Sequence, residues 1–360
     1  MLVYWVMFLL PASYALGART HTRASVHGMQ SARLNAAWLA VCIFLTLLIG
    51  YRFQVGGDWG TYLRHLYQAR YQDVSTAIEF QDPAYSLLNL LAVTQGWGIS
   101  GVNVVSAALF SLGLVVFCRG LPRPWLALAI AMPYLVTVVA MGYTRQSVAL
   151  GLAMLGLVAL TRKEVRWFVF WVICASTFHK SAVLLLPIAA LAATRSKYWT
   201  ALWIGVVSLG AYYLFLERSV DTLYTNYVEA QYQSQGAVIR TAMNFVPALL
   251  YLTFRRRFAL QPVEANLWRW FSIISILLFL TAILTLATTA VDRIALYMLP
   301  LQLVIFAHLP DALGRPGKAN SGFTGLILFY YACVLFVWLN FAANAHYWLP
   351  YRFYPLEFWF

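Results

Sequence analysis

The feature that most constrains this chain is a series of long apolar runs separated by short polar turns. Lipid offers the backbone no hydrogen-bond partner, so such runs fold as helices in a bilayer, and about 20 residues are needed for one crossing. The composition fits this solvent, because 62% of the residues are hydrophobic and only 10% are charged. The sequence therefore predicts an all-α, polytopic integral membrane protein that forms one membrane domain over residues 1–360.

About twelve runs are expected to cross the membrane, which places both termini on the same face. A further run at 84–93 is too short to span, and we interpret it as part of a re-entrant or interfacial helix near 84–96. The expected crossings are 2–17, 34–50, 101–118, 125–142, 146–161, 166–178, 181–193, 199–216, 239–254, 267–290, 294–309 and 322–341.

Charge divides unequally between the two faces that these crossings define. One set of alternate turns holds 16 basic residues and 3 acids, a net charge of +13, whereas the other set holds 9 of each. Basic turns stay in the cytoplasm, so the neutral set is expected outside it: a loop at 51–100 with interfacial helices, a second loop at 217–238 and a tail at 342–360. The net charge thus reports topology, and no nucleic-acid partner is expected. The basic set is Arg19, Arg23, Arg33, Arg119, Arg123, Arg162, Lys163, Arg166, Arg195, Lys197, Arg255, Arg256, Arg257, Arg269, Arg315 and Lys318, and its acids are Glu164, Glu264 and Asp311.

The neutral face also collects ionisable residues from separate parts of the chain. Such residues are costly at a membrane and are usually functional there. Five stretches carry them: YRFQVGGDWGTYLRHLY (51–67), GYTRQS (142–147), TFHKSA (177–182), VDRIALY (291–297) and HYWLPYRFYP (346–355).

Asp58 has two interpretations. It follows two glycines and precedes a helical pattern, so it fits the N-cap of a helix. It also lies one helical turn before Tyr62, so that the carboxylate and the phenol share a face. Asp82, followed by Pro83, is interpreted as the cap and first residue of the next helix.

Arg145 stands at the start of a predicted helix, where the helix dipole favours an anion. A bound anion would compensate for this, and Gln146 would assist as a neutral donor. His179 and Lys180 interrupt an apolar stretch, either as a polar turn or as a histidine that is biased towards neutrality and suits a base.

Two further pairs have plain structural alternatives. Asp292 and Arg293 fit an interfacial ion pair as well as a functional site. Tyr351 and Arg352 fit an anchor in the aromatic belt of the membrane as well as a substrate contact.

The sequence lacks the signatures of metal-dependent sugar transfer. Its twelve acids contain no Asp-x-Asp, Glu-x-Asp or adjacent pair, and there is no zinc-type histidine spacing and no phosphate-binding glycine loop. The four cysteines have no close pairing. We therefore expect no metal and no cofactor, and phosphate must be held by arginine and lysine.

Taken together, these residues resemble the EpsG family of Wzy-type polysaccharide polymerases over about residues 50–355. One departure is Gln81-Asp82-Pro83, where the family pattern has a glutamate before the proline, so Asp82 receives no catalytic role. The matching pieces are Arg52-x3-Gly56-x-Asp58-x3-Tyr62, Asp82-Pro83, Arg145-Gln146, Phe178-His179-Lys180-Ser181 and the late aromatic-arginine tail.

The resemblance implies a GT-C-like fold in the bacterial inner membrane, with an active site that faces the periplasm. The implied reaction is metal-independent polymerisation of undecaprenyl-pyrophosphate-linked oligosaccharides, which act as donor and acceptor, for O-antigen, lipopolysaccharide, capsule or exopolysaccharide. Membrane lipids and a chain-length regulator protein are the other partners that it suggests.

This hypothesis gives each candidate residue a role. The acceptor hydroxyl loses its proton to Asp58 or His179, a choice that stays open, and Arg145 takes part in catalysis. Pyrophosphate is held by Arg52, Arg145, Lys180 and Arg293, and sugars are positioned by Tyr62, Gln146, Asp292, Tyr351 and Arg352.

Other classes of protein remain open. A ligase that moves finished glycan onto a lipid acceptor would use nearly the same residues. A flippase should show inverted repeats with helices broken at mid-membrane, and no internal repeat is found. A membrane acyltransferase built around His179 leaves several arginines without a role.

Overall fold

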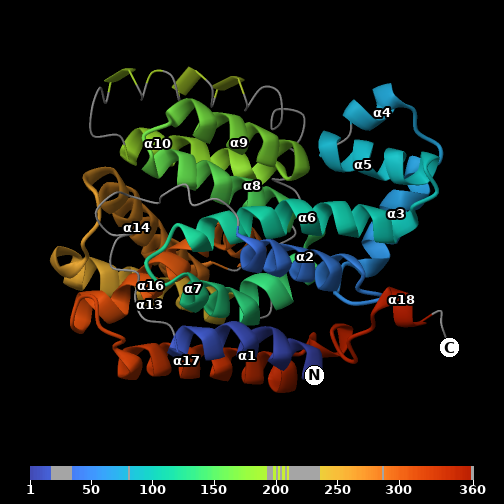
Figure 1. Ribbon diagram of the computed structural model, residues 1–360. Helices are drawn as coiled ribbons and strands as arrows, with labels where there is room; N and C mark the ends of the chain where they lie inside the picture. The colour runs from blue at the N-terminus through green and yellow to red at the C-terminus, as the bar shows by residue number, and fades with distance from the viewer. Residues whose placement is uncertain are drawn as a thin grey trace.

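A computed structural model describes residues 1–17, 35–79, 82–192, 236–285 and 288–357, with a few isolated residues between 198 and 210. Within these residues every regular element is a helix, which confirms the all-α prediction (Figure 1). The expected crossing at 199–216 and the loop at 217–238 lie almost entirely outside the described residues.

The long apolar helices support a multi-pass membrane protein. In the described part of the chain, five helices are long and apolar enough to cross a bilayer, and a sixth crossing results if two helices that meet at a 45° bend count as one. The predicted number of twelve therefore stays a prediction. The five are α6 (Gly98–Arg119), α8 (Thr144–Thr161), α13 (Ala237–Phe254, continued by the 3-10 turn Arg255–Arg257), α14 (Pro262–Leu284) and α17 (Ser321–Phe341); the bent pair is α15 (Thr288–Ala295, extended by the 3-10 turn Leu296–Met298) and α16 (Pro300–Leu313).

Shorter apolar helices run beside these (Figure 1). Large side chains on the outermost helices point away from the core, such as Leu9 on α1 and Leu326 and Phe329 on α17, which are 54%, 66% and 67% exposed. Exposed apolar surface of this kind marks contact with lipid. The shorter helices are α1 (Leu2–Gly17), α2 (Ala36–Gly50), α7 (Pro124–Ala131, continued by a π-helical segment, Met132–Ala140), α9 (Val165–Phe178) and α10 (Leu186–Ala192, preceded by a 3-10 segment, Lys180–Leu185).

Helix α8 forms the centre of the bundle, since 89% of the residues in its apolar span are buried. It approaches α6 closely where two glycines meet: a Cβ on Gly113 would collide with the backbone of Gly151, and a Cβ on Gly151 would lie 2.6 Å from the Cα of Phe110. The absence of a side chain at both glycines therefore allows α6 and α8 to pack closely. This contact fixes the start of α8, which carries Arg145, relative to α6.

The two ends of the bundle are a membrane's width apart. At one end the Arg123 guanidinium pairs with Asp311 at 2.9 Å and donates to the carbonyls of Lys318 and Ala319 at 2.8 Å each. From there α17 runs for 21 residues, about 30 Å, which matches the hydrocarbon thickness of a bilayer. After α17 the chain returns to Arg52, whose backbone forms an isolated antiparallel bridge with Phe353. Of the basic residues used to infer topology, Arg19, Arg23, Arg33, Arg195 and Lys197 lie outside the described residues.

Three short helices, α3 (Trp59–Ala69), α4 (Val74–Glu79) and α5 (Pro83–Thr94), form a cap beside the Arg52 end of the bundle (Figure 1). The cap has its own small apolar core, in which Tyr62 of α3 and Tyr85 of α5 meet Val102 of α6. Helix α5 has only 12 residues, too few to cross a bilayer, as expected for the segment near 84–96.

Candidate functional site

The chain leaves α2 through a turn that depends on Gly56. The φ of Gly56 is +105°, a conformation that side-chain-bearing residues rarely adopt, and a Cβ there would collide with the carbonyl oxygen of Met141. Its N–H donates to the carbonyl of Tyr347 at 2.9 Å. Glycine thus allows the segment before α3 to lie directly against the turn before α8.

Arg52 lies beneath this turn and is only 1% exposed. Its guanidinium donates to the carbonyl of Ile49 at 2.6 Å, to Oδ1 of Asn103 at 3.3 Å and to Oγ1 of Thr144 at 2.7 Å. Direct contact with pyrophosphate, which the sequence predicts, does not fit this burial. Arg52 instead ties the ends of α2, α6 and α8 together.

Asp58 occupies the N-cap position of α3, yet among the described residues its carboxylate makes no capping hydrogen bond. The cap interpretation of the side chain is therefore wrong. No other hydrogen bond or ion pair of this carboxylate is found in the described ranges. Burial raises the pKa of Asp58 above its usual value, while the positive charges of Arg293 and Arg145 act in the opposite direction. The site thus holds a half-buried, unpaired carboxylate that binds its proton more tightly than an exposed one.

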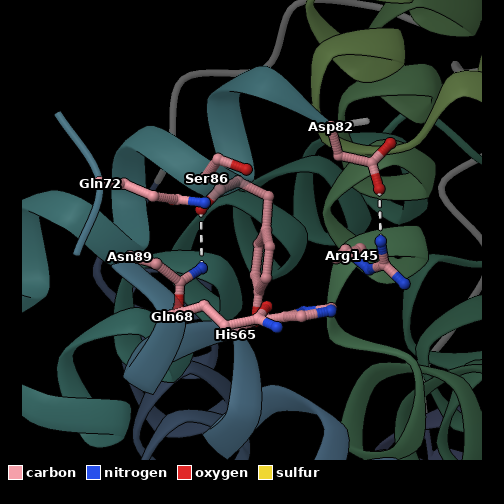
Figure 2. A pocket seen from close by; sticks show the side chains of 8 residues that line it. His65, Gln68, Gln72, Asp82, Ser86, Asn89 and Arg145 are labelled. Carbon is pink, nitrogen blue, oxygen red and sulfur yellow. Dashed lines mark hydrogen bonds and ion pairs between the residues drawn. The ribbon is translucent and has the colours of Figure 1, made fainter. Parts of the chain in front are cut away.

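Asp82 pairs with Arg145 across the junction of cap and bundle (Figure 2). Oδ2 of Asp82 lies 2.6 Å from Nη1 of Arg145, and its Oδ1 accepts from the backbone N–H of Lys180 at 3.4 Å. Asp82 and Pro83 are the N-cap and the first residue of α5, as predicted, but within the described chain the Asp82 side chain makes no capping hydrogen bond. A carboxylate binds a guanidinium, which carries a full positive charge, more strongly than it binds a backbone N–H in the first turn of α5. The carboxylate of Asp82 therefore supplies the anion that was expected beside Arg145 at the start of α8.

His179 ends α9 in an extended conformation and is half-buried. Its Nδ1 lies 2.7 Å from Oγ of Ser181, which in turn donates to the hydroxyl of Tyr297 at 3.3 Å. Burial lowers the pKa of His179 to about 3, and Arg145 and Arg293 add to the effect. The imidazole is therefore neutral at physiological pH.

Asp292 and Arg293 do not form the predicted ion pair with each other. Asp292 instead binds Arg240 of α13, with 2.8 Å between Oδ1 and Nε and 2.7 Å between Oδ2 and Nη2. Arg293 is half-exposed, and in the described part of the chain its guanidinium has no hydrogen bond or ion pair. Its backbone carbonyl accepts from Nε2 of Gln146 at 2.6 Å. The Asp292 carboxylate is thus already paired, whereas the Arg293 guanidinium is available near Asp58 and His179.

The remaining predicted residues serve different contacts. Tyr62 is buried against the ring of Tyr85, with centroids 5.9 Å apart. The Tyr351 hydroxyl donates to the carbonyl of Leu48 at 2.7 Å, which anchors the tail on α2. Arg352 is exposed and donates to Oε1 of Gln54 at 2.8 Å. Of these three residues only Arg352 is charged, and its side chain is exposed.

The sequence interpretation missed a set of polar residues next to the Asp82–Arg145 pair. They line a small pocket between α3 and α5 (Figure 2). Their spacing was a usable signal, because polar positions three and four residues apart share one face of a helix. The missed residues are His65, Gln68, Gln72, Ser86 and Asn89, and Arg240, the partner of Asp292, was missed as well.

Metal ligands do not converge in the described ranges, where no three His, Cys, Asp or Glu side chains are placed to hold an ion together. Three basic side chains at this end of the described structure, those of Arg145, Lys180 and Arg293, are partly exposed.

The chain resembles known proteins at the level of a family. The EpsG family model matches residues 35–353, which is most of the chain and includes every candidate residue named above. No curated protein and no solved structure shows a significant match.

Proposed function

The chain belongs to the EpsG family, the family of Wzy-like polysaccharide polymerases, and we propose that it joins undecaprenyl-pyrophosphate-linked oligosaccharides by glycosyl transfer. The observation that carries the proposal is the convergence of Asp58, Arg145, His179 and Arg293 at one end of an apolar helical bundle. A lipid-linked pyrophosphate is anionic at the membrane surface and apolar below it, so its chemistry suits such an end. We place this face outside the cytoplasm, on the charge asymmetry of the turns.

The two unpaired charges define the reacting centre. Asp58 and Arg293 influence each other electrostatically, yet in the described chain neither forms an ion pair. Charged groups at a membrane are costly unless they are paired or bind a ligand. A substrate that brings a hydroxyl to Asp58 and a phosphate to Arg293 would satisfy both groups together.

The proposed step balances without a further reactant. The acceptor hydroxyl oxygen attacks the anomeric carbon of the donor and forms the new glycosidic bond. The bond from that carbon to the pyrophosphate oxygen breaks, and its electron pair leaves with the lipid pyrophosphate. Asp58 takes the hydroxyl proton, and Arg293 and Lys180 stabilise the charge on the leaving group. Asp58 is the better base because burial raises its pKa, whereas the pKa of His179 is lowered.

The other residues support this centre in two ways. Arg145 uses one of its five N–H groups for Asp82, so others are left for a phosphate oxygen. Arg52 and Asp292 act as positioning residues through their protein partners, and Gln146 holds the Arg293 backbone. Arg352, which is exposed and bonded to Gln54, would contact sugars at the rim.

Reconstitution tests the proposal. The purified protein in liposomes would receive the lipid-linked repeat unit of its host, and products would be separated by length while released lipid pyrophosphate is measured. We expect a ladder of lengths from the wild type and from Arg70→Ala, an exposed arginine at the end of α3, and none from Arg293→Ala. A single transfer to a lipid acceptor would indicate a ligase. Transbilayer movement without pyrophosphate release would indicate a flippase.

A further inference from the structure

A buried chain of hydrogen bonds ends at the bend between α15 and α16. The Tyr331 hydroxyl of α17 donates to Oε1 of Gln302 at 2.6 Å, and Nε2 of Gln302 donates to Oδ1 of Asn244 at 2.7 Å. Nδ2 of Asn244 then donates to the backbone carbonyl of Ala295, the last residue of α15, at 2.8 Å. The three side chains are at most 3% exposed. The chain of bonds therefore joins α13, α16 and α17 to the end of the helix that carries Arg293.

Pro300 explains why the Ala295 carbonyl takes a side-chain donor. In a continuous α-helix the carbonyl of Leu296 would accept from the N–H of residue 300, and that of Ala295 from the N–H of Leu299. Proline has no N–H, and the N–H of Leu299 donates to Leu296 instead, at 3.2 Å. The Ala295 carbonyl thereby loses its α-helical partner at the 45° bend, and Asn244 provides a replacement.

The direction of every bond in this chain follows from that carbonyl. A carbonyl oxygen can only accept, so Asn244 must turn its amide nitrogen towards it and its own oxygen towards Gln302. Gln302 then has to donate to Asn244, and its oxygen accepts from Tyr331. Apolar side chains of the same shape would fill this space without needing any partner. The buried amides therefore indicate a role for the bond that they deliver to the bend.

The last turn of α15 is also held on the other side of Arg293. Arg240 binds the carboxylate of Asp292 through two N–H groups, and Gln146 donates to the Arg293 carbonyl. Arg240 and Asn244 are four residues apart on α13, so they share one face of that helix. This face of α13 thus holds α15 both before and after the position of Arg293.

We propose that Asn244 is a positioning residue for the Arg293 guanidinium, and that Gln302 and Tyr331 keep Asn244 in the orientation that this requires. The inference rests on the proposed function, in which Arg293 stabilises the charge on the departing pyrophosphate. A guanidinium bonds well to a phosphate oxygen only at the right distance and angle, so its backbone must be fixed as well. Because α15 has eight residues and ends at a bend, it is too short to be rigid by itself, and neighbouring helices must hold it.

A double-variant cycle on pyrophosphate binding tests this role without requiring polymerisation. The probe is geranyl pyrophosphate, a water-soluble prenyl pyrophosphate, titrated into the protein in lipid nanodiscs. We expect Asn244→Leu and Arg293→Ala each to weaken binding about tenfold or more. In the Arg293→Ala background, Asn244→Leu should weaken binding no further, because Asn244 acts through the guanidinium that is already gone.

Thr241→Val is the matched control. Thr241 is buried on α13 one turn from Asn244, and its hydroxyl donates to the carbonyls of Ala237 and Val238 in the same helix. The variant therefore removes buried hydrogen bonds of α13 that do not reach α15. It should bind geranyl pyrophosphate as the wild type does.

Arg240→Lys provides a second test should Asn244→Leu fail to fold. A lysine keeps a positive charge beside Asp292 but cannot reproduce the two bonds of the guanidinium. We expect this variant to weaken binding in the wild-type background and to leave it unchanged in the Arg293→Ala background.

The outcomes separate the two proposals. Equal weakening by Asn244→Leu with and without Arg293 would overturn the positioning role, as would wild-type binding in folded Asn244→Leu or in Arg293→Ala. Ladders from the reconstituted wild type would in each of these cases leave polymerisation standing. The expected binding pattern in a protein that never extends a repeat unit would overturn the proposed function and leave the positioning role.

Discussion

Asp82 and Arg145 are 63 positions apart in the sequence, and their side chains meet with 2.6 Å between Oδ2 and Nη1. Asp82 precedes the last helix of the cap, and Arg145 lies in the first turn of the most buried helix of the bundle. Lys180, from a third part of the chain, adds its backbone N–H to the same carboxylate. One acid therefore fixes the cap on the bundle at the edge of the candidate site.

Breaking this pair should reduce stability. Asp82→Asn leaves the Arg145 charge without its partner, and we expect a loss of about 2 kcal/mol, below the cost for a fully buried pair because a quarter of the Arg145 side chain stays exposed. The double variant Asp82→Asn/Arg145→Gln should lose less than the sum of the two single variants. Unfolding in detergent, followed by heat or denaturant, measures all three. Strictly additive losses would show that the pair contributes no coupling.

Substitutions at Asp58 should change turnover but not stability. Asp58→Asn and Asp58→Ala are each expected to lower the rate by about 10² to 10⁴, the usual contribution of a general base. Both should unfold like the wild type, because in the described structure the side chain makes no capping bond. If it did cap α3, Asn would be silent and Ala would cost about 1 kcal/mol. Ladders from Asp58→Asn together with an inactive His179→Gln would assign the base to His179.

The dependence of rate on pH should show one acidic limb. Asp58 acts only when deprotonated, so the rate falls as pH drops through its pKa, which burial raises above the usual value of about 3.9. His179, with a pKa of about 3, stays neutral above pH 4 and adds no limb between pH 5.5 and 7.5. Initial rates in liposomes between pH 4.5 and 8 measure this. A limb near pH 6.5 that disappears in His179→Gln would contradict the assignment.

Polymer synthesis should survive removal of divalent cations. The expectation comes from the acids of the sequence, which lack the clustered carboxylates that a hard cation requires. Liposomes would be treated with excess chelator on both sides of the membrane before substrate is added. Loss of the ladder, with recovery on addition of magnesium or manganese, would contradict charge stabilisation by arginine and lysine alone.

Labelling should place the site and the basic turns on opposite sides of the membrane. Gly60→Cys and Ser321→Cys introduce thiols at exposed positions near the two ends of the bundle. In intact spheroplasts a membrane-impermeant thiol reagent should modify the first and spare the second until lysis. The wild type, with its own four cysteines, gives the background. The reverse pattern would invert the topology.

The sequence predicts which residues gather at the site better than it predicts what they bind. Apolar runs define the ends of helices, so alternate turns share a face, and this places Asp58, Arg145, His179 and Arg293 together. Run length alone does not say whether a helix of 15 residues, such as α2, crosses the membrane. The helix count is therefore less certain than the grouping of residues.

Partner choice depends on distances between distant segments, which local patterns do not contain. Asp82-Pro83 has the local pattern of a cap, but the nearby guanidinium of Arg145 takes the carboxylate. Asp292 pairs with Arg240 on another helix and not with its neighbour Arg293. Arg52 stands at the end of an apolar run, where exposure is expected, yet Asn103 and Thr144 enclose it with hydrogen-bond acceptors. Each correction comes from contacts between helices.

The return of the chain from α17 to Arg52 has a practical consequence. Phe353 bridges Arg52, Tyr351 anchors on α2, and the N–H of Tyr354 donates to the carbonyl of Tyr51 at 2.7 Å. A purification tag fused next to these residues, or a truncation that removes them, would disturb the contacts that hold Arg52 and the end of α2 beneath the site. The exposed turn at 315–318, at the far end of the bundle, is the better place to insert an affinity epitope or a fusion partner for microscopy.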